Sequence, residues 1–115
     1  MKPDLVTIVF ITGTFPAVHC WPDCPFNEVF FLRAPHRHLF HYRMEKRVYH
    51  NDRDVEFFMF KNEVDSFIRG NLWNQDLGAM SCEMIATKLL EIFKACKVEI
   101  SEDGENGAVV QSLGD

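Results

Sequence analysis

The hydrophobic pattern of this chain changes near Glu56, and that change most limits the folds available to it. Before Glu56, apolar, aromatic and β-branched residues form continuous runs that are typical of strands, beginning with residues 5–15. After it, Phe57, Phe60 and Val64 recur three and four residues apart, which is the spacing of one helix face. At 115 residues, we expect one α+β domain spanning residues 1–115.

Six elements are predicted, in the order strand, strand, helix, helix, strand, strand. Their expected ranges are 5–15, 29–43, 57–70, 82–97, 98–100 and 108–110. The second strand is expected to be interrupted near Pro35 and extended over 46–50, and Ser81 is expected to cap the second helix. The arrangement predicts an antiparallel four-stranded sheet with two helices on one face, followed by a frayed tail at about residues 111–115.

Composition and charge exclude several classes of protein. Hydrophobic residues make up 47% of the chain and charged residues 25%, which is typical of a globular domain. A formal net charge of −5 argues against a nucleic-acid-binding protein, which would need a basic surface. No apolar run reaches the ~18–20 residues of a membrane span, and the first residues do not resemble a secretion signal. We therefore expect a cytoplasmic protein with reduced cysteines.

Three histidines are spaced to hold one metal ion. His36 and His38 lie two residues apart in an expected strand, so their side chains point to the same face. His19, which follows the first strand, could supply a third imidazole from a neighbouring strand. Three histidines would leave the fourth position of a tetrahedral zinc open, as in catalytic zinc sites. The alternative is that these are three ordinary histidines, two of which happen to be two residues apart.

Two cysteines follow His19 in a segment that contains two prolines. Cys24 is a candidate catalytic base or nucleophile, because a thiol near zinc has a lowered pKa. Its plain alternative is a half-buried loop cysteine. Cys20 and Cys24 could also combine with His36 and His38 in a structural zinc site, although the spacing is atypical of zinc fingers.

The order of the elements and of these motifs resembles the 6-pyruvoyl-tetrahydropterin synthase and 6-carboxy-tetrahydropterin synthase family over nearly the whole chain. In that family, zinc is held by F-x-x-x-H and H-G-H motifs. Their counterparts here are Phe15-Pro16-Ala17-Val18-His19 and His36-Arg37-His38. The family's D-F-x-x-L-K and T-S-E helix starts look like segments 56–61 and 80–83. Its V-x-E motif, whose glutamate clamps the pterin ring, looks like Ile100-Ser101-Glu102.

The resemblance implies the T-fold, with Zn²⁺ on His19, His36 and His38 and a pterin substrate bound by Glu102. It implies a lyase that acts on 7,8-dihydroneopterin triphosphate, on the tetrahydrobiopterin or queuosine route. It also implies a homo-oligomer, in which trimers close their sheets into a barrel and two trimers stack into a hexamer. In such an assembly, Glu102 would come from a different chain than the zinc ligands.

Two departures from the family pattern leave a second hypothesis open. The family's catalytic cysteine falls on Leu32, and its Asp-His pair falls near Leu72 and Trp73, where this chain has neither an acid nor a histidine. A non-catalytic T-fold relative that binds zinc and a pterin or purine ring would account for both. Glu102 likewise has a plain alternative, as one of several acids in a solvated turn.

Overall fold

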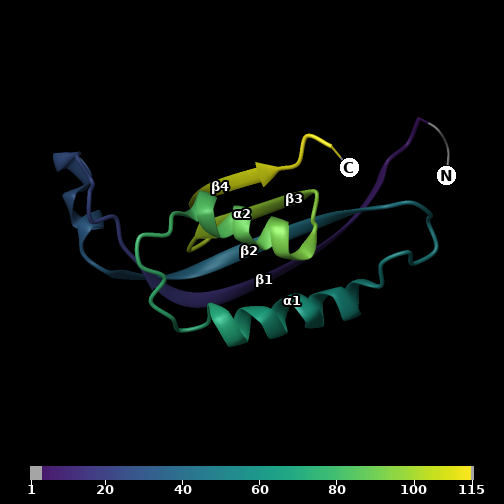
Figure 1. Ribbon diagram of the computed structural model, residues 1–115, viewed down its shortest axis with the longest axis horizontal. Helices are drawn as coiled ribbons and strands as arrows, with labels where there is room; N and C mark the ends of the chain where they lie inside the picture. The colour runs from purple at the N-terminus through teal and green to yellow at the C-terminus, as the bar shows by residue number, and fades with distance from the viewer. Residues whose placement is uncertain (1–3, 115) are drawn as a thin grey trace.

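The computed structural model describes residues 4–114, which form one four-stranded sheet and two α-helices (Figure 1). The elements are β1 (Thr7–His19), the 3-10 helix η1 (Asn27–Arg33), β2 (His36–Val48), α1 (Phe57–Asn71), α2 (Cys82–Phe93), β3 (Lys97–Glu102) and β4 (Asn106–Gln111). The strands lie in the order β1-β2-β3-β4, each antiparallel to its neighbour. The predicted α+β architecture and order of elements are confirmed.

The core lies between one face of the sheet and both helices. Alternate strand residues point to the same face, so Phe15 of β1 and Phe40 of β2 stack at a ring-centroid distance of 5.4 Å. The helices contribute Phe60 and Val64 from α1 and Leu89 from α2, all buried. Figure 1 shows α1 alongside β1 and α2 over β3 and β4. This face of the sheet continues to the chain segments where the histidines lie.

The second strand begins later than predicted. Residues 27–33 form η1, which buries none of its side chains, and β2 begins at His36, directly after Pro35. The physical reason is the pairing of the sheet: His19, the last residue of β1, is opposite His36, so residues before His36 have no strand to pair with. The expected interruption at Pro35 is therefore the start of the strand.

β1 runs to His19, beyond the predicted end at residue 15, and contains Pro16. Proline is tolerated there because β1 is an edge strand. A strap formed by residues 74–78 covers the outer edge of β1. Its backbone bonds include Asn74 N–H to Pro16 O at 2.7 Å and Leu77 N–H to Val18 O at 2.7 Å. The strap holds the His19 end of the strand.

α2 ends at Phe93 instead of continuing to residue 97. Lys94 adopts the left-handed conformation (φ 53°), which stops the helix, and Lys97 begins β3 opposite Glu45. The predicted cap is confirmed, since Ser81 Oγ accepts a hydrogen bond from Met84 N–H at 3.2 Å.

At the C-terminus, the tail expected at about 111–115 lies partly outside the described residues. Within them, Gln111 ends β4 and Ser112 N–H donates to Cys96 O at 2.9 Å. Among residues 4–114, no helix is long and apolar enough to cross a membrane.

Candidate metal centre

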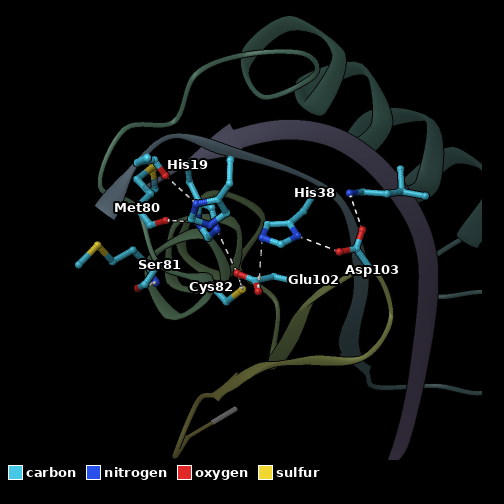
Figure 2. Close-up of polar contacts among 11 residues, drawn as sticks. His19, His38, Met80, Ser81, Cys82, Glu102 and Asp103 are labelled. Atoms are coloured by element: carbon cyan, nitrogen blue, oxygen red, sulfur yellow. Dashed lines mark hydrogen bonds and ion pairs between the residues drawn. The ribbon is translucent and has the colours of Figure 1, made fainter. Parts of the chain in front are cut away.

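Three histidines and one glutamate meet at one end of the sheet. His19 closes β1, His36 and His38 open β2, and Glu102 closes β3. Each offers a metal-binding atom, and these atoms all lie within 4.8 Å of one another. Figure 2 shows His19, His38 and Glu102 directed toward one another. The predicted convergence of the three histidines is thus present, and Glu102 joins them.

The cluster packs against the apolar side chain of Phe40. His19 is 6% exposed, and its ring packs at a right angle to the Phe40 ring with a centroid distance of 5.2 Å. The His38 and Phe40 ring centroids are 5.7 Å apart. The alternation of β2 that buries Phe40 in the core also turns His36 and His38 to the same face. The histidines therefore belong to the rim of the core.

The hydrogen bonds of the rings assign their tautomers. The Nδ1 atoms of His19 and His36 lie 2.8 Å and 2.9 Å from the carbonyl oxygens of Met80 and Ala34. Carbonyl oxygens only accept hydrogen bonds, so each Nδ1 carries a proton, which leaves Nε2 as the ring atom that can bind a metal. This arrangement is typical of metal-binding histidines, whose other nitrogen donates to a fixed acceptor.

His38 is held in the same way by a carboxylate. Its Nδ1 donates to Asp103 Oδ2 at 2.8 Å, while Asp103 Oδ1 accepts the backbone N–H of Leu39 at 3.0 Å. These two bonds, the first being the larger cause, hold the pKa of the Asp103 carboxyl below its usual range. Asp103 adopts a left-handed conformation (φ 57°), which aspartate tolerates better than most residues.

The four residues fit a metal ion chemically. The Nε2 atoms of His19, His36 and His38 are buried and have no hydrogen-bond partner. His19 Nε2 lies 3.0 Å from Glu102 Oε2, and His38 Nε2 lies 3.6 Å from Glu102 Oε1. With neutral imidazoles, each approach brings two lone pairs together, which is repulsive unless a cation lies between them. Imidazole and carboxylate donors are those that zinc prefers in proteins.

A cavity of about 500 Å³ adjoins the cluster. Its lining includes His19, His36 and Glu102 together with the side chains of Trp21 and Leu32. Its volume and its combination of apolar side chains with polar groups are typical of small-molecule sites.

Cys82, which the sequence reasoning missed, also lines this cavity. Its Sγ donates a hydrogen bond to Glu102 Oε2 at 3.8 Å. Burial, together with the charge of Glu102, raises the pKa of Cys82 to about 12, so the thiol is protonated at neutral pH. The only sequence signal for it was its position next to the helix cap Ser81.

Cys24 is fully buried, and its Sγ points to the carbonyl oxygens of Phe26 and Val29, each at 3.8 Å. It is not among the residues that line the cavity, and its catalytic role stays a prediction. Within residues 4–114, the group of donors able to hold a metal contains neither Cys20 nor Cys24. The alternative zinc site built on these two cysteines is therefore not formed.

The expectation that Glu102 would reach the histidines from another chain is wrong. β3 pairs with β2 so that Glu102 stands opposite Phe40, two residues along the strand from His38. One chain is therefore sufficient to bring all four side chains together.

The positions that depart from the family pattern lie apart from one another. Leu32 lines the cavity, whereas Leu72 is buried in the core and Trp73 lies at a different cavity beside Gly13.

No protein-family model matches the chain, and no curated protein matches its sequence. The structure is similar to that of 6-pyruvoyl tetrahydropterin synthase from Caenorhabditis elegans, with a TM-score of 0.76 and 14% identity, over 97% of this chain and 99% of that one. It is also similar to an uncharacterized protein from Wolinella succinogenes, with a TM-score of 0.78 and 16% identity, over 95% of this chain and 99% of that one. The chain therefore has the T-fold of 6-pyruvoyl tetrahydropterin synthase.

Proposed function

We propose that this chain is a zinc-dependent tetrahydropterin synthase-like protein. In this proposal, His19, His36 and His38 hold Zn²⁺, and the substrate is 7,8-dihydroneopterin triphosphate or a related pterin. The product would be a 6-pyruvoyl or 6-carboxy tetrahydropterin. The observation that carries the proposal is the convergence of three buried histidine Nε2 atoms beside a ring-sized cavity, on the fold of a tetrahydropterin synthase.

Glu102 is the residue proposed to recognise the ring. A carboxylate suits the paired N–H donors of a pterin or guanine edge, because both oxygens accept near-parallel, charge-strengthened hydrogen bonds. Glu102 lines the cavity, and Trp21 and Leu32 offer apolar surface to the faces of a bicyclic ring. When bound, zinc would supply Lewis-acid chemistry toward the oxygens of the substrate side chain.

Proton transfer requires a further residue besides the zinc ligands and Glu102. Cys24 remains its candidate, but its Sγ faces the carbonyl groups of Phe26 and Val29. Cys24 would reach the cavity only if the segment after His19 rearranged.

A second candidate is a non-catalytic protein that binds zinc and a pterin or purine ring without turning it over. It is favoured by one observation: Leu32, at the position where the resembled family has its catalytic cysteine, lines the cavity with a side chain that cannot carry a proton. The first candidate requires another residue to do that work.

We propose that the chain functions as a cytoplasmic homo-oligomer, a trimer or a hexamer. Only part of the outer edge of β1 is covered by the strap at residues 74–78. The other half of β1 carries two large apolar side chains that are exposed, Ile8 (44% exposed) and Phe10 (51% exposed). Pairing between edge strands of neighbouring copies would remove these open edges.

Turnover tests the proposal directly. Zinc-loaded protein is incubated with 7,8-dihydroneopterin triphosphate, the products are separated by chromatography, and His36→Ala serves as the control. A product that disappears in the control supports the synthase. Ring binding that depends on Glu102 without any product supports the second candidate, and the absence of both contradicts the two proposals together.

A further inference from the structure

We propose that Glu102 is the fourth ligand of a metal held by His19, His36 and His38, and that a pterin-type ring must remove it from the metal in order to bind. The first half of this proposal concerns the metal alone. The second half rests on the proposed function. Together they mean that the Glu102 carboxylate can bind either the metal or the ring, but not both at the same time.

Both oxygens of Glu102 are directed into the histidine cluster. Oε2 lies 3.0 Å from His19 Nε2, and Oε1 lies 3.6 Å from His38 Nε2. In a tetrahedral zinc centre with ligand distances of ~2.0–2.1 Å, neighbouring ligand atoms are about 3.3–3.4 Å apart. The two observed separations fall on either side of that value. The carboxylate therefore stands where a fourth ligand belongs.

A proton is the other species that could join Glu102 to the histidines. A proton on His19 Nε2 would make one hydrogen bond to Glu102 Oε2, since His19 Nδ1 already donates to Met80 O. A second proton on His38 Nε2 would face Glu102 Oε1 at 3.6 Å, but the buried Nε2 of His36 would still have no partner. One metal ion accepts all of these lone pairs at once, so the geometry favours the metal.

A fourth ligand from Glu102 would occupy the open coordination position that a catalytic zinc requires. Three histidines alone would leave that position free, whereas a fourth protein ligand closes it, as in structural zinc sites. Recognition of a ring edge requires both carboxylate oxygens to point into the cavity. Glu102 lines that cavity as well as the cluster, so a rotation of its side chain exchanges one role for the other. By linkage, a bound ring and the fourth metal bond weaken each other equally.

The fourth-ligand half is tested by the affinity of the full chain for zinc, measured in competition with a chromophoric chelator. Glu102→Gln keeps the shape of the side chain and removes the charged ligand. Its matched control is Glu105→Gln, which removes one charge from an exposed position of the same hairpin. We expect Glu102→Gln to bind zinc at least about 10-fold more weakly and Glu105→Gln to bind like the natural chain.

Equal zinc affinities for the two variants would overturn the fourth ligand. Circular dichroism verifies that both variants fold. Cobalt-substituted natural protein gives an independent reading, because its visible absorption distinguishes four-coordinate from higher-coordinate metal. A spectrum that is not four-coordinate, or one that is the same in Glu102→Gln, would also overturn it.

The competition half is tested by repeating the zinc titration with saturating pterin. We expect pterin to weaken zinc binding to the natural chain and to leave Glu102→Gln unchanged. Pterin that binds without changing the zinc affinity overturns the competition but leaves the proposed function standing. If pterin fails to bind, both the competition and the ring part of the proposed function are overturned, while the comparison of the two variants still decides the fourth ligand.

Discussion

The Nδ1 of His38 donates to Asp103 Oδ2 at 2.8 Å, which fixes the lone pair of Nε2 toward the centre of the cluster. Asp103 is in turn tied to β2 by two further bonds to one residue, since its Oδ1 accepts Leu39 N–H and its own N–H donates to Leu39 O at 2.8 Å. The β3–β4 turn therefore positions one histidine of the candidate metal centre through the nitrogen that faces away from the cluster.

Replacing Asp103 by asparagine is expected to weaken zinc binding about 10- to 100-fold. Asparagine tolerates the left-handed backbone of this position, but it has a single accepting oxygen for the N–H groups of His38 and Leu39. An amide nitrogen facing His38 would favour the tautomer that carries its proton on Nε2, and a protonated Nε2 has no lone pair to offer a metal in the cluster. Chelator competition measures the affinity, and an Asp103→Asn protein that binds zinc as tightly as Glu105→Gln would contradict the role.

Asp103 should also make stability depend on pH in the acid range. Its pKa in the folded state is lowered, first by the hydrogen bond from His38 and then by that from Leu39. The ionised carboxylate therefore contributes stability above the unfolded pKa of about 3.9, and this contribution is lost as the pH falls through the folded pKa.

Denaturant unfolding of metal-free protein checks this expectation. The difference in the free energy of unfolding between the natural chain and Asp103→Asn should be present at neutral pH and should vanish in strong acid. A difference that grows toward acid pH would have the wrong sign.

The thiol of Cys82 is expected to resist ionisation. Burial, and then the charge of Glu102, raises its pKa to about 12. Thiolate absorbs in the ultraviolet, so subtracting the pH titration of Cys82→Ala from that of the natural chain isolates this one group. The difference should stay flat up to about pH 10 and rise beyond it, given that an unperturbed thiol ionises near pH 8.5. A rise near pH 8.5 would show that Glu102 and burial do not act on Cys82.

Two glycine-to-alanine substitutions should shift stability in opposite directions. A Cβ at Gly13 would meet ring atoms of Tyr42, with Cζ at 2.8 Å and Oη at 2.9 Å, and the displaced ring would lose its hydrogen bond to Asp65. A Cβ at Gly70, in α1, would meet nothing within 4 Å. We expect Gly13→Ala to destabilise by about 1–3 kcal/mol and Gly70→Ala to stabilise by about 0.4–1 kcal/mol.

Thermal and denaturant unfolding, compared with the natural chain, measure both changes. A Gly13→Ala change that does not destabilise the chain would mean that the Tyr42 ring moves aside freely and does not need the space left by Gly13.

Much of the fold follows from local pattern, because the spacing of apolar residues along the sequence predicts which segments are strands and which are helices. The parts that differ are set by tertiary partners. Residues 29–33 contain enough apolar side chains for a strand, but β1 ends opposite His36, so no partner is left for them. The helix pattern of α2 continued past Phe93, but pairing of Lys97 with Glu45 required an earlier stop.

In the candidate site, too, local pattern predicts the residues that share a strand face, and tertiary contacts determine the rest. His36 and His38 share a face whenever their segment is a strand, and His19 lies close to them because its strand pairs antiparallel with theirs. Glu102 was found through resemblance alone, since nothing in its turn distinguishes it from the neighbouring acids. Asp103 and Cys82 could not be found, because their contacts depend on how the β3–β4 turn folds onto β2 and how the start of α2 packs on β3.

The direct pairing of His19 with His36 has a consequence for how this chain can change over evolution. Side chains alternate with a period of two, so inserting or deleting one residue between His38 and Phe40 would send both imidazoles of β2 to the outward face of the sheet while the rest of β2 stayed in place. The core would survive this event and the cluster would not. Insertions and deletions between His38 and Phe40 would therefore be tolerated only in descendants that no longer need the cluster. The number of residues between these two positions thus shows whether a descendant still uses the cluster.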